Sequence, residues 1–151
     1  MGNRIRIASP CDAEAISSLI IRALRESNAK DYPPSVIARV QQGFDPEAIL
    51  LMLVKRRVLV AENRQTVLGT GSLDGDVIRS VYVDPAHQGQ GIGRLLMAEL
   101  ERAAIAAGVE RLKVPSSLTA EGFYARLGFR AIREITEGEE RTIVMERGLG
   151  E

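Results

Sequence analysis

The segment His87–Arg94 has a composition that suits the binding of a phosphate group. It contains Gly89, Gly91 and Gly93, follows the apolar run 77–83 and precedes the helical pattern 95–107. The first turn of a helix has backbone N–H groups without partners in the helix and carries about half a positive charge. Glycines let an anion approach that backbone because they have no Cβ. The segment therefore predicts a site for a cofactor that carries a pyrophosphate.

Other interpretations of these glycines fit less well. A dinucleotide-binding fingerprint needs a third glycine where this chain has Arg94, and a P-loop needs Gly-Lys followed by Ser or Thr. A tight turn with positive φ also uses glycine, but three alternating glycines exceed what a turn requires. We therefore favour the phosphate site.

The elements around the loop indicate a mixed α/β fold. Apolar spacings of three and four residues predict helices near 9–27, 35–42, 95–107 and 118–127, with another helical turn over 45–52. Strands are predicted at 4–8, 58–62, 66–73, 77–83, 111–114, 129–135 and 142–145, with 137–140 as a solvated hairpin loop. The strand–helix–strand crossover makes strands 77–83 and 111–114 parallel. A cofactor cleft is expected at the carboxyl ends of these strands, beside Val83 and Val114.

Length and composition exclude several classes of protein. A chain of 151 residues with 45% apolar content predicts one domain over 1–151. Twenty basic and twenty acidic residues cancel, so neither nucleic acid nor a membrane is an expected partner. Cys11 has no cysteine to pair with, and no metal is expected because no cluster offers ligands at workable spacing. Without a signal peptide or an apolar span, we expect a cytoplasmic protein.

Three segments resemble the GNAT superfamily of acyl-CoA-dependent N-acyltransferases. They are the strand Val81-Tyr82-Val83-Asp84-Pro85, the loop Gln88-x-x-Gly91-x-Gly93 and the segment Phe123-Tyr124-Ala125-Arg126-Leu127-Gly128-Phe129. The similarity covers about 58–132, and 4–24 resembles the family's usual first strand and helix. It implies a mostly antiparallel sheet of six to seven strands, flanked by about four helices, with one splayed parallel pair. It also favours a homodimer.

The resemblance implies acetyl-CoA, or a related acyl-CoA, as acyl donor. The loop backbone would bind the pyrophosphate, and the splayed strand would bind the pantetheine arm through its unpaired backbone groups. Taken alone, a Val-x-Val strand is ordinary core. Ser117 stands where many members have an asparagine, and a serine there either donates a hydrogen bond or caps a helix near Leu118. The cofactor-binding residues implied are Val81, Tyr82, Val83, Gln88, Gly89, Gln90, Gly91, Ile92, Gly93 and Ser117.

Tyr124 matches the family tyrosine whose hydroxyl lies near the sulfur of the acyl-CoA, which makes it the expected catalytic residue. A free tyrosine has a pKa near 10 and a thiol near 8.5, so complete proton transfer to the thiolate is uphill by about 2 kcal/mol unless the site lowers the tyrosine's pKa. We therefore expect Tyr124 to act partly as a hydrogen-bond donor to the leaving sulfur. The structural alternative is a tyrosine that packs beside Phe123.

The acceptor and the general base are less defined. An amine attacks only in its neutral form, so a base or a chain of waters is needed. Asp74, Asp76 and Glu26 are candidates, although each also suits a turn or a surface. By resemblance, acceptor selection involves the first two helices and their loop, about 22–42 with Tyr32, and the loop between the last strands.

These observations favour an N-acetyltransferase in which a primary amine of a small molecule or peptide attacks acetyl-CoA directly in a ternary complex. The alternative is a non-catalytic acyl-CoA-binding or regulatory module on the same fold. Transfer to a hydroxyl or to a protein lysine is a third possibility that the same chemistry permits.

Overall fold

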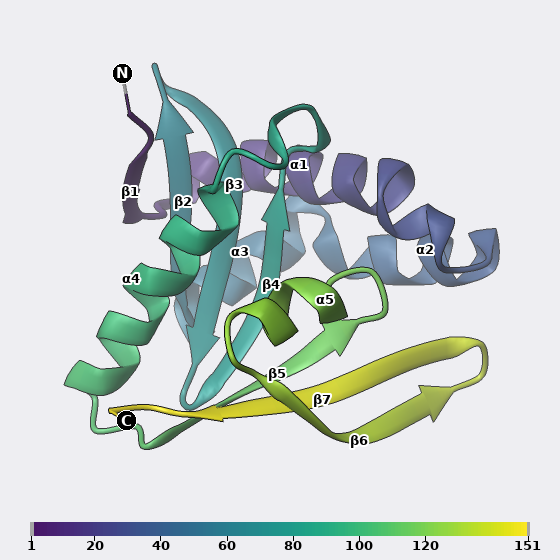
Figure 1. Cartoon of the computed structure of the whole chain (residues 1–151). Helices are drawn as coiled ribbons and strands as arrows, with labels where there is room; N and C mark the ends of the chain where they lie inside the picture. Colours follow the sequence, from purple (N-terminus) through teal and green to yellow (C-terminus); the bar gives the residue numbers. More distant parts are fainter. Residues whose placement is uncertain (1, 151) are drawn as a thin grey trace.

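The computed structural model describes residues 2–150, and its centre is a seven-stranded sheet with the order β1-β2-β3-β4-β5-β7-β6 (Figure 1). Neighbouring strands are antiparallel except for β4 and β5, which are parallel. This confirms the predicted mixed α/β fold. The strands are β1 (Arg4–Ile7), β2 (Arg57–Asn63), β3 (Thr66–Asp74), β4 (Val77–Val83), β5 (Arg111–Ser117), β6 (Arg130–Glu137) and β7 (Glu140–Gly148).

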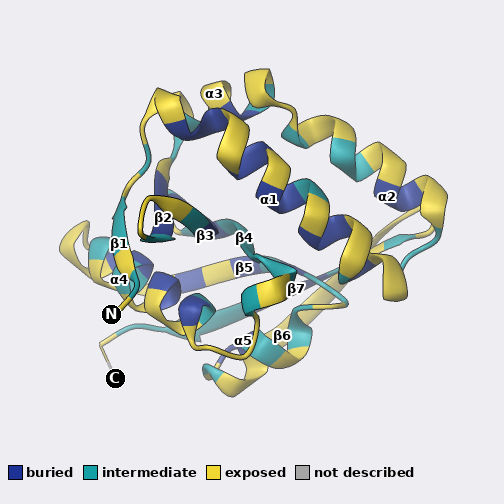
Figure 2. Cartoon of the chain, turned by 90° about the horizontal axis from the view of Figure 1, so that it is seen from above, coloured by how far each residue is buried: buried dark blue, intermediate teal, exposed yellow. Residues whose placement is uncertain are grey.

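Helices cover both faces of the sheet and make three layers (Figures 1 and 2). One face carries α1 (Ala13–Glu26), α2 (Pro34–Gln41) and α3 (Pro46–Lys55), and the other carries α4 (Ile92–Ala106) and α5 (Glu121–Arg126). Side chains alternate along a strand, so β2 sends Val58 and Val60 to the α1 side and Leu59 and Ala61 to the α4 side. Within residues 2–150, no helix combines the length and the apolar character needed to cross a membrane.

The entry to α1 is fixed by one buried carboxylate. Asp12 accepts hydrogen bonds from the Arg6 guanidinium at 2.8 and 2.9 Å and from the backbone N–H of Ser9 at 2.8 Å. Arg6 also lies 3.0 Å from Glu62 on β2. The hydrogen bonds from Arg6 lower the pKa of Asp12. Asp12 therefore joins the first helix to the edge of the sheet.

Some predicted boundaries are wrong, and Pro115 explains one of them. Strand β5 continues past Val114 to Ser117 although proline cannot donate to a ladder. The N–H of Lys113 donates to the carbonyl of Asp76, the residue before β4, at 3.0 Å, so the nitrogen of Pro115 faces the same side. The pairing of β5 with β7 is therefore unaffected.

Other boundaries also differ from the sequence prediction. Helix α3 is a full helix rather than a turn, and β7 is longer than 142–145. The helix predicted to begin near Leu118 begins at Glu121, because residues 118–120 form a turn in which the N–H of Ala120 bonds to Ser117 Oγ at 3.1 Å.

The parallel strands separate because β4 contains a bulge. Ser80 adopts a φ of 55°, and the register with β3 shifts between Thr70 and Ser72. A bulge of this kind bends a strand. In the described chain, β4 and β5 pair only at Val77 and Lys113, and beyond that point they diverge. The splayed pair implied by the resemblance is thus present.

Candidate active site

A cavity of about 470 Å³, here called the loop cavity, lies where β4 leads through residues 84–91 into α4. Gly89 and Gly91 have φ values of 79° and 82°, and a Cβ on either would meet no atom within 4 Å. Gly91 is the N-cap of α4, and the first helical hydrogen bond runs from the N–H of Leu95 to its carbonyl. The N–H groups of Ile92, Gly93 and Arg94 therefore have no acceptor inside the helix. The loop can take an anion against its backbone.

Two contacts hold the loop in place. The side-chain amide of Gln88 donates to Ser27 Oγ on the segment after α1, at 3.1 Å. A Cβ on Gly93 would lie 3.0 Å from the ring of Phe123, so this glycine lets α5 pack against the first turn of α4. The loop cavity is thus bounded by α1, α4 and α5.

The loop cavity brings together the predicted cofactor-binding residues. All of them line it except Gln90, which belongs to the loop but is not part of the lining. Sequence reasoning missed Arg94 and Arg126, two cations that line the same cavity. Arg94 directly follows the glycines in sequence, whereas Arg126 comes from α5 and is brought there by the fold.

The splayed edge of β4 exposes backbone groups toward the cavity. The N–H of Asp84 bonds to Leu68 of β3 at 2.8 Å. Because alternate residues of a strand point to opposite neighbours, Val83 and Val81 direct their N–H and C=O groups away from β3, toward the gap beside β5. These are the two valines that the sequence singled out.

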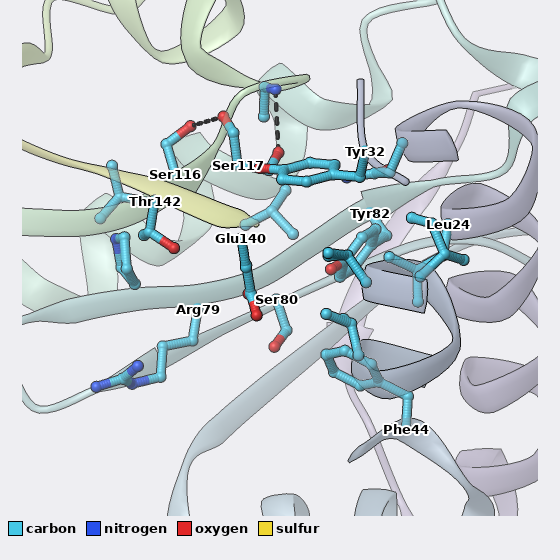
Figure 3. Close-up of a pocket in the computed structure, with 18 of the residues that line it drawn as sticks. Leu24, Tyr32, Phe44, Arg79, Ser80, Tyr82, Ser116, Ser117, Glu140 and Thr142 are labelled. Carbon is cyan, nitrogen blue, oxygen red and sulfur yellow. Dashed lines mark hydrogen bonds between the residues drawn. The ribbon is translucent and has the colours of Figure 1, made fainter. Parts of the chain in front are cut away.

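A second cavity of about 320 Å³, here called the helix cavity, lies between α1, α2 and the diverging strands (Figure 3). Its lining is largely apolar on the side of α1 and α2, and β4, β5 and β7 contribute polar residues on the opposite side. The apolar lining includes Leu24, Val36, Ile37, Val40 and Phe44. The polar lining includes Arg56, Arg79, Ser80, Ser117, Glu140 and Thr142.

The two cavities meet at a shared wall. The residues that line both are Asn28, Val81, Tyr82, Ser117, Ala120 and Tyr124. Ligands bound in the two cavities would therefore approach each other at Tyr124 and Tyr82. Ser117 helps to hold this wall, because its hydroxyl accepts the hydrogen bond from Ala120 described above.

Tyr124 is 4% exposed and packs edge-on against Phe123 and Phe129, with ring centroids 5.2 and 5.8 Å away. Burial raises its pKa well above the usual value, and the nearby Tyr82 adds to the effect. Within residues 2–150, no group makes a hydrogen bond with the Tyr124 hydroxyl. The hydroxyls of Tyr32 and Thr70, in contrast, do make hydrogen bonds. The aromatic packing expected from the alternative interpretation is thus present together with a free hydroxyl at the junction.

The carboxylates proposed as bases from the sequence lie elsewhere. In the part of the chain that the structure describes, Asp74, Asp76 and Glu26 line neither cavity. Glu140 lines the helix cavity instead, and its carboxylate is 2.6 Å from Arg39 of α2. The sequence prediction of a solvated loop over 137–140 is wrong at both ends, because β6 extends to Glu137 and β7 begins at Glu140. The side chain of Glu140 lines the cavity.

Tyr32 closes the helix cavity on the side of β7, as the sequence suggested for this region. Its hydroxyl donates to the carbonyl of Arg141 at 2.9 Å and accepts from the N–H of Leu118 at 2.8 Å. Next to it, Asp31 accepts a hydrogen bond from Thr119 at 2.7 Å. The segment after α1 is thus fastened to the opposite side of the gap.

Known proteins share this fold. A structure described as a GCN5-related N-acetyltransferase from Rhodopseudomonas palustris superposes with a TM-score of 0.93 at 25% identity, covering 99% of this chain and 97% of that one. The PaiA N-acetyltransferase of Thermoplasma acidophilum, solved in complex with coenzyme A, gives 0.84 at 20% identity over 98% and 99% of the two chains.

Sequence comparison leads to the same group. YafP of Escherichia coli K12, described as an uncharacterized N-acetyltransferase, is 27% identical over 131 residues, which cover 87% of this chain and 83% of YafP. The family model for the acetyltransferase (GNAT) domain matches residues 28–145. The chain therefore belongs to the GNAT family of acetyltransferases.

Proposed function

We propose that the protein transfers an acetyl group from acetyl-CoA to a primary amine, with acetyl-CoA in the loop cavity and the amine in the helix cavity. The observation that carries this proposal is the meeting of the two cavities at Tyr124. Direct transfer needs both substrates bound at once with their reacting atoms adjacent.

Several features of the loop cavity fit a CoA thioester. Gly89 and Gly91 leave space that a Cβ would occupy, and the N–H groups of the first turn of α4 suit a diphosphate. Arg94 and Arg126 add positive charge. The similar fold of PaiA holds coenzyme A. The backbone groups of Val81 and Val83 that face away from β3 suit the amide groups of a pantetheine arm.

The reaction balances without a covalent enzyme intermediate. The neutral amine attacks the thioester carbonyl, a C–N bond forms, the C–S bond breaks and the nitrogen loses one proton. A backbone N–H near Val83 stabilises the oxyanion that develops on the carbonyl oxygen. Glu140 is the carboxylate that lines the acceptor side among residues 2–150, and we assign it to receive the proton, directly or through water.

Tyr124 donates a hydrogen bond to the departing sulfur. Its raised pKa makes complete transfer of the phenolic proton even less favourable than for a free tyrosine. A neutral donor that keeps its proton still stabilises the thiolate, and this is the role expected from the sequence.

Two measurements test the proposal. Calorimetry with coenzyme A should detect binding, and mass spectrometry with deuterated acetyl-CoA should find a labelled amide after incubation with a panel of amines, amino acids, polyamines and peptides. Binding without a labelled product for any acceptor would favour the non-catalytic module. No binding of any CoA thioester would remove the basis of the proposal.

A further inference from the structure

The helix cavity has three regions of different chemistry. The first is the junction at Tyr124 and Ser117, where an amine must lie to be acetylated. The second is the apolar wall of α1, α2 and Phe44. The third is cationic and contains Arg56 and Arg79. In Figure 3, Arg79 lies at one end of the cavity and Leu24 and Phe44 at the other, with Glu140 and Ser80 between them.

Arg56 is a half-buried cation without a counterion. It follows the last residue of α3, and its Nη1 donates to Ser80 Oγ at 3.3 Å. It forms no ion pair with any carboxylate of residues 2–150. Burying a charge is costly unless an opposite charge compensates it. The position of Arg56 therefore suits a ligand that brings an anion.

Arg79 strengthens this requirement. It lines the same region, and its Nε is 3.4 Å from the carboxylate of Asp74. Among residues 2–150, Arg79 thus has this carboxylate beside it, whereas Arg56 has no carboxylate within ion-pair distance. Burial lowers the pKa of Arg56 and the charge of Arg79 lowers it further, whereas Asp74 raises it. Positive charge is in excess in this part of the cavity.

We infer that the acceptor is an α-amino acid with an apolar side chain, whose carboxylate binds Arg56 and Arg79 and whose side chain packs against α1 and α2. The inference rests on the proposed function. An α-carbon carries an amine, a carboxylate and a side chain, and these three groups match the three regions. A guanidinium is well suited to a carboxylate because it offers paired N–H donors.

The size and charge of the cavity argue against other amines. A volume of about 320 Å³ is at the low end of ligand pockets, which run from roughly 300 to 1,000 Å³. A polyamine would place a second cation against Arg56 and Arg79, where like charges repel. A peptide N-terminus would bring no carboxylate at that distance from its amine.

Three acceptors that differ only in the carboxylate provide the test. L-leucine, L-leucinamide and 3-methylbutylamine share the same amine and branched side chain, and spermidine serves as the cationic comparison. The purified full chain should use leucine with a kcat/KM about 10- to 100-fold above the other acceptors, the range expected for a charge-assisted hydrogen-bonded pair. The amine of leucinamide is less basic than that of leucine, so a larger fraction of it is neutral and able to attack. A preference for leucine must therefore come from binding.

A pair of neighbouring variants locates the preference. Arg56→Gln should reduce kcat/KM for leucine about 10- to 100-fold and reduce kcat/KM for leucinamide much less, because the amide carries no charge. Circular dichroism verifies that the variant is folded. Arg57→Gln is the matched control, because Arg57 is exposed and lines neither cavity. Calorimetry on the CoA-saturated proteins should show weaker leucine binding to Arg56→Gln than to the wild type or Arg57→Gln. This measurement does not depend on turnover.

The outcomes separate this inference from the proposed function. If leucinamide, 3-methylbutylamine or spermidine is acetylated as well as leucine or better, the inference is wrong and the acetyltransferase proposal stands. Equal losses for leucine in both arginine variants would also overturn it. If CoA binds but none of these amines, nor any of the wider panel, is acetylated, the proposed function is wrong, and the inference that rests on it is wrong as well.

Discussion

Tyr124 is packed among aromatic rings, yet its hydroxyl meets no hydrogen-bond partner within the described residues and lies at the junction of the two cavities. Replacing it with phenylalanine keeps that packing and removes only the hydroxyl. We expect Tyr124→Phe to lower kcat about 10- to 100-fold, because one hydrogen bond to a developing thiolate is lost. The affinity for CoA, measured by calorimetry, should stay close to that of the wild type.

The pH dependence of the same variant separates a hydrogen-bond donor from a titrating acid. Because burial raises the pKa of Tyr124, the phenol stays protonated throughout the usual assay range of about pH 6 to 9. The profiles of kcat against pH should therefore have the same shape in the wild type and in Tyr124→Phe. A descending limb that is present in the wild type and missing in the variant would contradict the donor role.

Asp12 offers a prediction about stability. Its carboxylate accepts bonds from Arg6 and Ser9, so Asp12→Asn should lower the free energy of unfolding at pH 7 by about 1–3 kcal/mol. The pKa of Asp12 is lowered by folding, so this contribution is complete above the unfolded value near 3.9 and is lost as the pH falls through the folded-state pKa. Urea unfolding should show a constant difference between wild type and variant from about pH 5 to 7, and a shrinking one below about pH 4. Glu14→Gln, at an exposed position in the first turn of the same helix, should lose only the smaller contribution of about 0.3–1 kcal/mol from the helix dipole.

At the scale of elements, the turn into α4 can be tested against a matched turn. Gly91→Ala and Gly75→Ala both place a Cβ in open space at a positive φ, so each should lose about 1–2 kcal/mol of stability. Gly91 lines the loop cavity, whereas Gly75 belongs to the turn between β3 and β4. Calorimetry should therefore find weaker CoA binding, by about tenfold, for Gly91→Ala alone. Equal affinities in the two variants would remove the loop from the binding site.

Element order and strand direction could be predicted because they follow from local periodicity and from the short connections between strands. Boundaries that depend on tertiary neighbours could not. In the sequence, Pro115 indicates the end of a strand. Its missing N–H costs no ladder hydrogen bond because it faces the gap beside β4. In the sequence, Glu140 belongs to an acidic run that indicates a loop. The pairing of β7 with β5 and β6 places it at the cavity.

In the candidate site, too, some residues could be predicted from the sequence and others could not. The glycines and Tyr124 could be predicted because a loop and a helix carry them as contiguous motifs. Arg56 could not, since its place in the cavity depends on the bulge at Ser80, 24 residues away. The bulge itself has no marker in the sequence, because a serine with positive φ is unusual. A glycine at that position would have indicated it.

At the scale of the whole molecule, the seven strands form one sheet, but one pair of neighbouring strands has little backbone pairing. Strands β4 and β5 are joined at a single register position in the described chain, and both cavities occupy the gap beyond it. The segment after α1 spans this gap through Tyr32 and through Asp31 with Thr119, and α2 spans it through Arg39 with Glu140. The expectation of one domain over 1–151 and that of a homodimer stay predictions.

Tyr32 tests how far these bridging contacts hold the two sides together. Tyr32→Phe removes the donor to Arg141 and the acceptor for the N–H of Leu118, so we expect a loss of about 1–2 kcal/mol in unfolding free energy. Because the helix cavity lies beneath this contact, KM for the acceptor should rise more than the dissociation constant of CoA. Hydrogen exchange should also accelerate at the amide of Leu118.

A matched control removes a hydroxyl that joins nothing across the gap. Thr136 lies on the exposed strand β6, and within residues 2–150 its hydroxyl bonds only Glu134 of the same strand, at 3.4 Å. Thr136→Val should leave both the exchange at Leu118 and KM unchanged. If Tyr32→Phe behaves like this control, the divergent strands are held apart by the bulge and the packing of α1 alone, and the hydroxyl of Tyr32 has no part in shaping the cavity.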